Sequence, residues 1–404
     1  MANVSSSNGI EKYPKLRFPE FTEPWSHIKL SDFTERVMRK NKNNETNLPL
    51  TISSKDGLVD QVTFFNKTVA SKDMSGYYLL KKGEYAYNKS YSVGYDFGSI
   101  KRLERYPMGA LSTLYICFAL TKYNSDYIKT YFDSLKWYKE IYMISAEGAR
   151  NHGLLNVPTD EFFSTFHYIT EDLKEQEKIA KLMQLIELRI QKQQALVDNL
   201  KKYKRGLQFL VFEKNQNNNW DKKTLLEIAS FCGGGTPSKD IKDYWSGEIG
   251  WISSSDLDEE WIDSLSITRH ITQSAIDNSA TKLCPKGTIS VVSRVGVGKV
   301  VVMPENLCTS QDFINITSID GDTNFFAYQI AYKMKIQATK TQGTSIKGVT
   351  SETLKAMVLD IPSLEEQKHI ATMLSTFDVR LKAEIKTLNK MQFIKNGLLQ
   401  QLFI

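Results

Sequence analysis

The sequence predicts an α+β protein with two globular domains, related by pseudo-two-fold symmetry and separated by an antiparallel two-helix coiled-coil spacer. Two observations support this prediction. A long amphipathic helix pattern covers residues 175–212 and occurs again, without a gap, 191 positions later over residues 366–403. In the rest of the chain, short runs of β-branched and aromatic residues mix with helical stretches, too irregularly for a repeated βαβ unit.

The two helix patterns correspond in identity and in apolar spacing. The identical pairs are Glu175/Glu366, Gln176/Gln367, Ile179/Ile370, Ala180/Ala371, Arg189/Arg380, Lys204/Lys395, Gly206/Gly397, Leu207/Leu398 and Phe212/Phe403. Apolar residues recur in steps of four and three, the heptad spacing of supercoiled helices. The residues expected to line the spacer are Ile186, Ile190, Val197, Leu200, Leu207, Phe377, Leu381, Leu388, Met391 and Leu398. Such a helix cannot bury its apolar stripe alone, so each copy is the expected partner of the other; two unrelated helices on separate domains are the alternative.

Polar residues interrupt both stripes at corresponding positions. One antiparallel register sets Lys204 beside Glu384 and Gln193 beside Lys395. A slip of one heptad overlaps more of each helix but sets these polar groups against aliphatic side chains, at a cost in desolvation. We therefore expect the first register.

Caps and composition divide the chain into four segments: a first globular domain (14–169), a first spacer helix (170–213), a second globular domain (214–361) and a second spacer helix (362–404). Thr170 is the expected N-cap of the first long helix, and Pro362-Ser363 the expected start of the second. In the first domain we expect strands at 61–65, 83–88 and 111–120 and helices at 123–135 and 160–165. In the second domain we expect strands at 288–293, 299–303 and 313–317 and a helix at 324–337.

Composition favours an intracellular protein with a polyanionic partner. Of the 404 residues 41% are hydrophobic, which is typical of soluble globular domains. The net charge of +6 suits a polyanionic partner but does not require one. The four cysteines are scattered and form no Cys-x-x-Cys motif, so reduced thiols are expected. The sequence has no apolar run of signal-peptide or membrane-spanning length. We expect a cytoplasmic location and no membrane contact.

No motif in the sequence predicts catalysis or metal binding. An amino-methyltransferase would need an Asn/Asp-Pro-Pro-Tyr/Phe loop, and the chain has no Pro-Pro pair. Residues 293–299 resemble a phosphate-binding loop, but Val300 stands where that motif needs Ser or Thr, so a strand-turn-strand is expected. The five histidines occur singly, without metal-ligand spacing. We expect no catalytic residue and no metal site.

Several short motifs carry a resemblance to a known family. They are Pro14–Phe21 with Trp25, Tyr87–Ser90, Gly109–Tyr115, Gly233–Ser238, Tyr244–Ile249, Ser293–Lys299 and the two Glu-Gln helix starts. In these motifs and in its two-copy order, the chain resembles the specificity subunit of type I restriction–modification systems.

The resemblance implies a non-catalytic subunit with two target-recognition domains, each reading one half of a split double-stranded DNA sequence. It also implies two methyltransferase subunits that bring S-adenosylmethionine, and restriction/translocase subunits that use ATP and Mg, so that no cofactor is expected in this chain. Helices of some 35 residues span roughly 50 Å and could hold two reading domains over successive turns of B-DNA, which are about 34 Å apart. The alternatives are a coiled-coil scaffold without a DNA function and a free-standing DNA methyltransferase.

Residues with the chemistry for phosphate and base-edge contacts occur in both domains. The candidates for DNA binding are Arg36, Arg39, Lys40, Lys42, Tyr87, Asn88, Lys89, Lys101, Arg102, Thr236, Ser238, Lys239, Ser254, Arg294, Lys299, Thr344 and Lys347. A solvated surface role is the alternative for each of them, and we expect a third to a half to lie near DNA. Trp25, Trp220 and Trp245 are expected in the core rather than stacked on bases.

Overall fold

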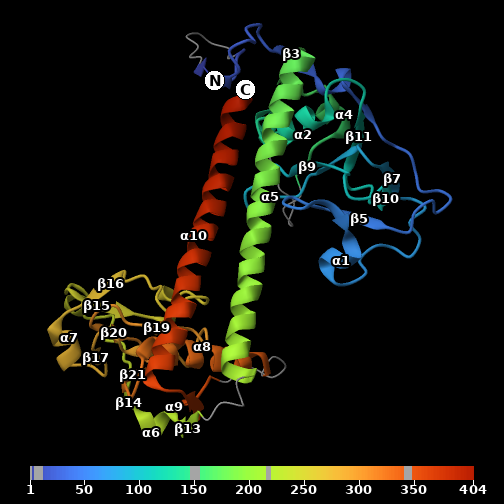
Figure 1. Cartoon of the computed structure of the whole chain (residues 1–404). Coiled ribbons are helices and arrows are strands. Elements are labelled where there is room, and N and C mark those ends of the chain that lie inside the picture. Colours follow the sequence, from blue (N-terminus) through green and yellow to red (C-terminus); the bar gives the residue numbers. More distant parts are fainter. Residues whose placement is uncertain (1, 4–11, 146–154, 215–219, 341–347) are drawn as a thin grey trace. The chain divides into compact units, whose positions relative to one another are not determined.

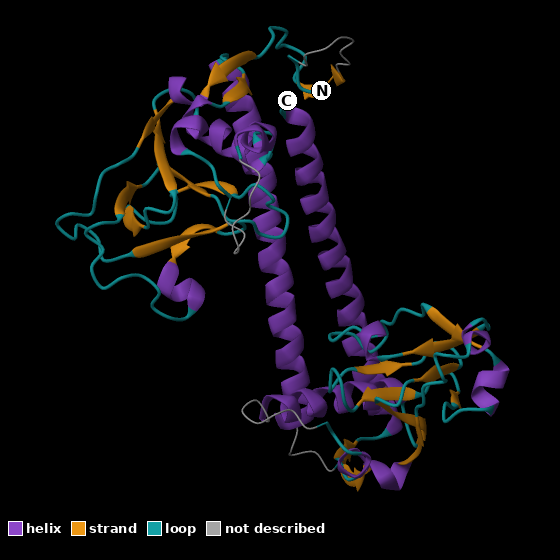
Figure 2. Cartoon of the chain, turned by 180° about the vertical axis from the view of Figure 1, so that it is seen from behind, coloured by secondary structure: helices purple, strands orange, loops and turns teal. Residues whose placement is uncertain are grey.

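The computed structural model describes residues 2–3, 12–145, 155–214, 220–340 and 348–404 (Figure 1). The chain is α+β and forms two compact units. The first unit consists of Met1–Gln194 together with Thr387–Ile404, and the second unit consists of Ala195–Lys386. Each unit therefore combines one β-rich domain with part of each long helix. Figure 2 shows the two long helices as unbroken, with most of the strands gathered in the two β-rich domains.

Two four-stranded sheets form the β-rich domain of the first unit. One has the antiparallel order β4-β11-β8-β9, and the other has the order β6-β5-β10-β7, in which β5 and β10 are parallel. The strands are β4 (Thr34–Arg36), β5 (Pro49–Ser53), β6 (Gly57–Asp60), β7 (Tyr78–Lys81), β8 (Tyr85–Asn88), β9 (Ser99–Arg102), β10 (Met108–Leu111) and β11 (Ile116–Leu120).

Short helices and two small strand pairs complete the first unit. The helices are α1 (Gln61–Phe65), α2 (Ser125–Asp133), α3 (Tyr138–Ile144) and α4 (Thr159–Ser164), with a 3-10 turn at Leu30–Asp32. The strand pairs are β1 (Ala2–Asn3) with β2 (Leu16–Arg17) and β3 (Ser26–Lys29) with β12 (Phe166–Ile169). An aromatic core lies between β8, β11 and these helices; Tyr87, for example, stacks on Phe162 and meets Trp137 edge-on.

The β-rich domain of the second unit repeats this topology. Its sheets have the orders β14-β21-β18-β19 and β16-β15-β20-β17, and β15 and β20 are parallel. The strands are β14 (Ala229–Gly233), β15 (Ile249–Ile252), β16 (Arg269–Ile271), β17 (Leu283–Cys284), β18 (Ile289–Val292), β19 (Val300–Val302), β20 (Leu307–Thr309) and β21 (Phe313–Ile319), with β13 (Asp221–Thr224) paired to β22 (Val358–Ile361). The helices are α6 (Leu225–Ile228), α7 (Gln273–Asp277), α8 (Thr323–Lys340) and α9 (Ser351–Lys355), with 3-10 turns at Lys242–Trp245 and Ser254–Asp256.

Each long helix is joined to its own unit by a buried glutamine of its first turns. Gln176 Oε1 accepts the N–H of Asn124 at 2.8 Å, and Gln176 Nε2 donates to Thr170 O at 2.7 Å. In the second unit, Gln367 Oε1 accepts the N–H of Asp322 at 2.8 Å and its Nε2 donates to a backbone carbonyl at 2.9 Å. Asn124 and Asp322 precede α2 and α8, so each glutamine binds the residue before the next packed helix. This geometry explains why the glutamine of the Glu-Gln motif is duplicated.

The two long helices, α5 (Leu173–Phe209, extended by a π-helical turn to Lys214) and α10 (Leu364–Leu402), pack together in antiparallel fashion. In the second unit Lys204 Nζ lies 2.6 Å from Asp378 Oδ1, and in the first unit Lys395 Nζ lies 2.9 Å from Glu187 Oε1. The order of partners runs in opposite directions along the two helices, as an antiparallel pair requires. The ten residues expected to line the spacer are all buried or half-buried.

The register expected from the sequence is wrong. Lys204 binds Asp378 rather than Glu384, and Lys395 binds Glu187 rather than Gln193. Each acid lies six positions before the expected partner. The helices therefore take nearly the register of the one-heptad slip, which overlaps more of each helix. The physical reason is that acidic residues beside the apolar stripe of each helix can pair with the lysine charges. Asp378 follows Phe377 in the sequence and Glu187 occupies the matching place in α5, so the flexible lysine stems can reach them.

Most predicted strands and helices are confirmed, with three corrections. Residues 61–65 form helix α1 rather than a strand, because Asp60 accepts the N–H of Val62 at 3.0 Å as an N-cap. Residues 111–120 belong to two strands in different sheets, β10 and β11, separated by a turn. Asp172, rather than Thr170, caps α5 by accepting the N–H of Lys174 at 2.8 Å. The expected start of α10 is confirmed, since Ser363 Oγ accepts the N–H of Glu366 at 3.3 Å.

Candidate nucleic-acid interface

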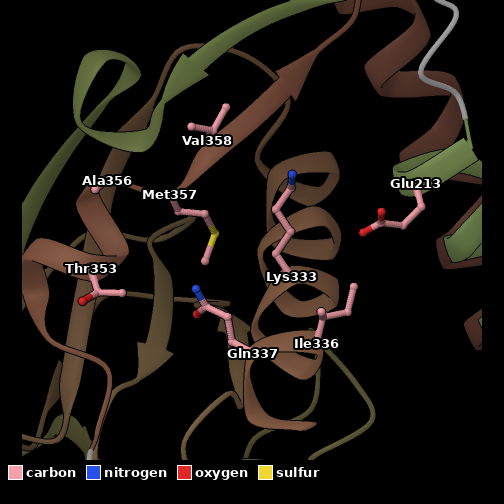
Figure 3. Close-up of a pocket in the computed structure, with 8 residues that line it drawn as sticks. All are labelled: Glu213, Lys333, Ile336, Gln337, Thr353, Ala356, Met357 and Val358. Atoms are coloured by element: carbon pink, nitrogen blue, oxygen red, sulfur yellow. The ribbon is translucent and has the colours of Figure 1, made fainter. Parts of the chain in front are cut away.

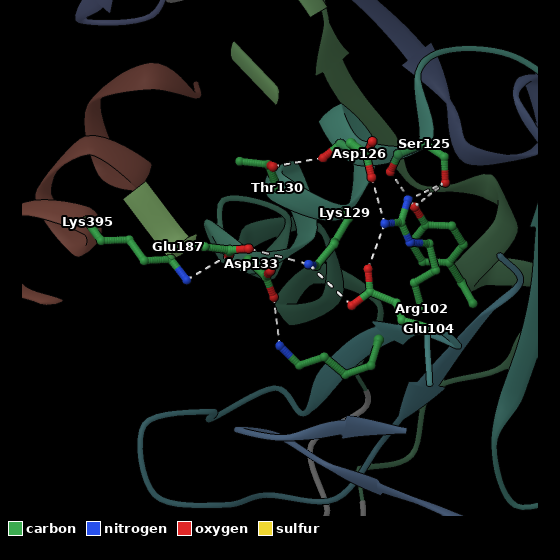
Figure 4. Close-up of polar contacts among 11 residues, drawn as sticks. Arg102, Glu104, Ser125, Asp126, Lys129, Thr130, Asp133, Glu187 and Lys395 are labelled. Atoms are coloured by element: carbon green, nitrogen blue, oxygen red, sulfur yellow. Dashed lines mark hydrogen bonds and ion pairs between the residues drawn. The ribbon is translucent and has the colours of Figure 1, made fainter. Parts of the chain in front are cut away.

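Several predicted cations of the first unit bind acids within the protein. Arg102 donates to Asp126 at 2.6 Å and to Glu104 at 2.7 Å, and Lys101 donates to Asp133 at 2.7 Å (Figure 4). In Figure 4 these groups join strand β9 to helix α2, and the same network continues through Lys129 and Glu187 to Lys395. Arg102 and Lys101 therefore hold helix α2 to the sheet in this structure.

Other predicted residues of the first unit are also engaged internally. Arg39 forms a bidentate pair with Glu84 at 2.7 and 2.8 Å. Lys40 donates to Gly76 O at 3.1 Å and lies over the ring of Tyr78. Tyr87 is fully buried, and Asn88 Oδ1 accepts a backbone N–H two residues later in the chain. The structure places Tyr87 in the aromatic core.

Three of the predicted cations of the first unit have no acidic partner among the described residues. Arg36 and Lys42 are exposed. Lys89 is half-buried at the start of the β8–β9 loop, and burial lowers the pKa of its ammonium group. A lysine whose charge is partly desolvated by the protein gains more from a nearby phosphate than a fully hydrated one does.

In the second unit, the two cations of the β18–β19 turn, Arg294 and Lys299, differ in their contacts. Lys299 Nζ donates to Leu257 O at 3.0 Å and to Ser254 O at 3.4 Å, which fixes the turn to the loop after β15. Arg294 is exposed beside Val295, whose side chain is 71% exposed, and the turn passes through Gly296 and Gly298 at positive φ. Arg294 is therefore available to a partner, whereas Lys299 holds its own loop. The expected strand-turn-strand over residues 293–299 is confirmed.

The backbone of the glycine-rich loop 233–238 packs closely against other backbone segments of the second domain. A Cβ on Gly234 would lie 1.9 Å from Ser310 O, and one on Gly235 would lie 2.4 Å from backbone atoms of residues 280 and 281, so no side chain fits at either position. Of the predicted residues here, Thr236 bonds to Gln311, whereas Ser238 and Lys239 are exposed. Thr344 and Lys347 lie outside the described residues.

A short duplicated motif at the end of strand β5 and of strand β15 escaped the sequence analysis in part. Ile52-Ser-Ser-Lys-Asp56 and Ile252-Ser-Ser-Ser-Asp256 are 200 positions apart, and only Ser254 of the second copy is among the predicted residues. In each copy the first serine bonds to the aspartate, at 2.8 Å for Ser53 and 3.1 Å for Ser253. A comparison of the two halves at this offset would have found the first copy.

Each duplicated motif contacts the neighbouring hairpin turn of its own unit. Ser54 Oγ lies 3.0 Å from Ser92 Oγ in the β8–β9 loop, and Ser254 O accepts the Lys299 ammonium of the β18–β19 turn. We call residues 53–56 with 89–98 the first loop pair, and residues 253–256 with 293–299 the second loop pair. Both carry hydroxyl groups, at least one exposed cation (Lys55 or Arg294) and an exposed valine, groups that can contact phosphates and base edges.

Arg269 is a further residue that the sequence analysis missed. Its guanidinium group pairs with Asp256, donates to Ser253 Oγ at 2.7 Å and lies over the ring of Trp251. The side chain is still 38% exposed. It therefore adds positive charge beside the second loop pair while holding its aspartate in place.

A hollow of about 450 Å³ lies elsewhere in the second unit (Figure 3). Its lining residues are Glu213, Lys333, Ile336, Gln337, Thr353, Ala356, Met357 and Val358. Lys333 pairs with Asp360 at 3.1 Å, and none of these lining residues is a cysteine or a histidine. Within the described residues there is also no group of three potential metal ligands, and no helix there is both long and apolar enough to cross a membrane.

The three predicted core tryptophans have internal packing roles. Trp25 is buried between Tyr127 and Phe403, and Trp220 packs on Phe325. Trp245 is half-buried and donates to Ser238 O at 3.0 Å.

The long helices expose apolar side chains at corresponding positions of the repeat. Leu188 and Val379 are 46% and 66% exposed, and Tyr203 and Ile394 are 68% and 47% exposed. Each pair is related by the offset of 191 positions. Each unit therefore has one exposed apolar side chain at each of the two repeated positions.

Comparison with known proteins links the chain to one family. Residues 217–391 match the family model described as "Type I restriction modification DNA specificity domain". The MjaIX specificity subunit of a type I restriction enzyme from Methanocaldococcus jannaschii is 37% identical over 164 residues, 39% of this chain and 38% of the relative. The EcoR124I/EcoR124II specificity subunit from Escherichia coli is 30% identical over 166 residues, 39% of this chain and 40% of the relative. The matches thus span about two fifths of the length of these curated relatives.

Solved structures share the fold over nearly the whole chain. The specificity subunit of a type I restriction-modification system from M. genitalium superposes with a TM-score of 0.57 at 15% identity, covering 97% of this chain and 99% of that one. A chain from a structure concerned with complex assembly and conformational transition of the type I restriction-modification system superposes with a TM-score of 0.60 at 15% identity, covering 94% and 97%. At this identity the likeness shows the fold alone: two β-rich domains with two long helices packed together.

Proposed function

We propose that this chain is a type I restriction-modification specificity subunit, the non-catalytic DNA-reading subunit of such a complex. The match of residues 217–391 to the specificity-domain model and the two curated relatives support the proposal. The observation that carries the proposal is the duplication of one domain topology. Both β-rich domains have the same pair of sheets, and each is joined to a long helix through the same buried glutamine contact. Two similar readers on one chain suit a DNA target with two halves.

In this proposal each β-rich domain reads one half of a bipartite double-stranded DNA sequence through its loop pair. Arg294, Lys55 and Lys89 are the cations best placed for this role, because they have no acidic partner among the described residues. Arg36, Lys42, Ser238 and Lys239 supply further exposed contacts. Arg39, Lys101, Arg102 and Lys299 act in the domain scaffold instead, because their charges are already engaged.

The proposal assigns catalysis and cofactors to partner subunits. Two methyltransferase subunits would bring S-adenosylmethionine, and restriction/translocase subunits would use ATP and Mg. The repeated exposed side chains Leu188/Val379 and Tyr203/Ile394 support two copies of one partner, since equivalent surfaces occur once in each unit. The long helices would then serve both as the spacer between reading domains and as the scaffold for the complex.

An exchange of the first domain tests the proposal. Residues 30–165 are replaced by the corresponding segment of a relative with another target, and the full chain is expressed with its methyltransferase partners. Sequencing of methylated adenines should show one half of the recognition sequence changed and the other half, with its spacing, retained. A single uninterrupted motif, or an unchanged motif after the exchange, would rule out bipartite reading by the two domains.

A separate measurement distinguishes a free-standing methyltransferase. Such an enzyme would bind S-adenosylmethionine without a partner, whereas the proposed subunit would not. Calorimetric titration of the purified chain with S-adenosylmethionine should give no binding heat, and the same titration of the assembled complex serves as the positive control. Saturable binding by the chain alone would contradict the proposed division of labour.

A further inference from the structure

Two cysteines of the second unit face each other between its two sheets. Cys232 lies on β14 of one sheet and Cys284 on β17 of the other, and their sulfur atoms are 3.2 Å apart. Both thiols pack against the same apolar cluster, which includes Val292, Leu307 and Phe313. Two thiols from different sheets are thus already in contact in the folded domain.

The two thiols differ in access and in acidity. Cys284 is buried, whereas Cys232 is half-buried, so an external reagent reaches Cys232 first. The two sulfur atoms share a hydrogen bond, and the hydrogen bond with Cys284 lowers the pKa of Cys232 to about 7. The same hydrogen bond and burial raise the pKa of Cys284. Cys232 is therefore the nucleophile of the pair, because the thiolate is the reactive form.

We propose that Cys232 and Cys284 form a reversible disulfide that links the two sheets of the second domain. The oxidant is a low-molecular-weight disulfide such as oxidised glutathione. The Cys232 thiolate attacks one glutathione sulfur, the glutathione S–S bond breaks, and one glutathione leaves. The Cys284 sulfur then attacks Cys232 Sγ, and the second glutathione leaves as a thiolate that takes up the Cys284 proton. Two protein thiols are oxidised while one glutathione disulfide is reduced to two thiols.

The cross-link restrains the start of the glycine-rich loop. Gly233 follows Cys232 directly, and the Gly235 N–H is already bonded to Thr309 O at 2.8 Å on strand β20. β20 pairs with β17, which carries Cys284. The disulfide would therefore link β14, which leads into the loop, to β17, which neighbours the strand that the loop already contacts. This link would lower the conformational freedom of the loop. It would also close a chain segment of 52 residues, which disfavours the unfolded state.

The remaining cysteines serve as internal controls. Cys117 is buried on β11 of the first unit and is the only cysteine in that unit. Cys308 lies on β20, where burial raises the pKa of its thiol to about 11. Because β20 lies next to β17, Cys308 is the other cysteine of the second unit that could pair with Cys232, and its variant tests the assignment.

The full-length chain is equilibrated in glutathione buffers with a rising oxidised fraction, alkylated and mapped by mass spectrometry without reduction. We expect a peptide pair joined through residues 232 and 284 in the wild type and in the variants C308S and C117S, and none in C232S or C284A. Linkage of 232 to 308, or no protein disulfide at any glutathione ratio, would overturn the proposal.

Thermal unfolding provides a second measurement that does not depend on the DNA-reading function. Oxidation should raise the melting temperature of the second domain by roughly 5 °C or more, and dithiothreitol should reverse the shift. Because Cys232 is half-buried, C232S should fold and lack the shift. An equal shift in C232S would also overturn the proposal.

Discussion

Lys204 Nζ lies 2.6 Å from Asp378 Oδ1, and the same ion pair recurs at the corresponding repeat positions as Lys395 with Glu187, at 2.9 Å. The two copies differ in environment. Lys204 and Asp378 are 7% and 3% exposed, and Asp378 also accepts a hydrogen bond from Tyr328. Lys395 and Glu187 are 25% and 26% exposed. One chain therefore contains a buried and a half-exposed version of a single interaction.

The buried ion pair should contribute far more to stability than its copy. Asp378→Ala leaves the Lys204 charge buried without its partner and should destabilise the second unit by about 3–5 kcal/mol. Glu187→Ala, its matched control in the repeat, should cost about 1 kcal/mol or less because water solvates Lys395. Denaturant unfolding followed by circular dichroism measures both. Equal losses would contradict this account, and the double variant Lys204→Met/Asp378→Leu should recover much of the loss.

The glutamines that join the long helices to the β-rich domains should also be essential for stability. Gln176→Ala or Gln367→Ala leaves a backbone N–H and a backbone C=O without their partner, at a cost of about 1–3 kcal/mol in the free energy of unfolding. The exposed Gln392 on α10 is the control, and its alanine variant should change stability by less than about 0.5 kcal/mol. Similar effects for Gln367 and Gln392 would show that the duplicated contact is dispensable.

His167 should make stability depend on pH. Thr165 Oγ1 donates to Phe162 O at 2.7 Å, so it accepts from His167 Nε2 at 2.9 Å, and His167 Nδ1 accepts from Tyr131 OH at 2.8 Å. The ring is therefore neutral, with its proton on Nε2. Burial lowers the pKa of His167 to about 3, whereas the unfolded chain has the ordinary pKa of about 6.5.

Below pH 6.5 the unfolded state binds the proton and the folded state does not, so this group destabilises the fold progressively as the pH falls towards 3. At pH 5 the loss should be about 2 kcal/mol relative to pH 7.5. Unfolding of the wild type and of His167→Gln at both pH values isolates the effect, which the variant should lack. His270→Gln, at an exposed position, should keep the wild-type pH dependence; an unchanged dependence in His167→Gln would exclude this origin.

Two cations of the β18–β19 turn should give opposite phenotypes. Arg294→Ala should weaken DNA binding by about 1–3 kcal/mol if Arg294 reads a base, relaxing specificity at one position, with no loss of stability. Lys299→Met should instead lower the stability of the second unit by about 1–3 kcal/mol, because two carbonyl groups lose their donor. Binding to the recognised sequence, measured by fluorescence anisotropy, and thermal unfolding separate the two. Normal DNA binding by Arg294→Ala would remove it from the interface.

Much of the candidate site could be predicted only as a type of chemistry. The sequence indicated cations and hydroxyl groups in both domains, and Arg294 and Lys239 are indeed exposed. It could not distinguish them from Lys101 and Arg102, because Asp133 and Asp126, which pair with these two cations, come from helix α2, more than twenty positions later in the sequence. Tyr87 was assigned to the interface for the same reason, since its aromatic neighbours in the core come from other segments of the chain.

The sequence by itself determined the duplication and the two long helices, because heptad spacing and a gapless repeat are local and periodic properties of a chain. Only the tertiary structure decided the helix register, the partners of the charged residues and the contact between Cys232 and Cys284. These depend on which side chains from distant segments meet and on how far burial removes them from water. Spacing along a sequence carries neither quantity.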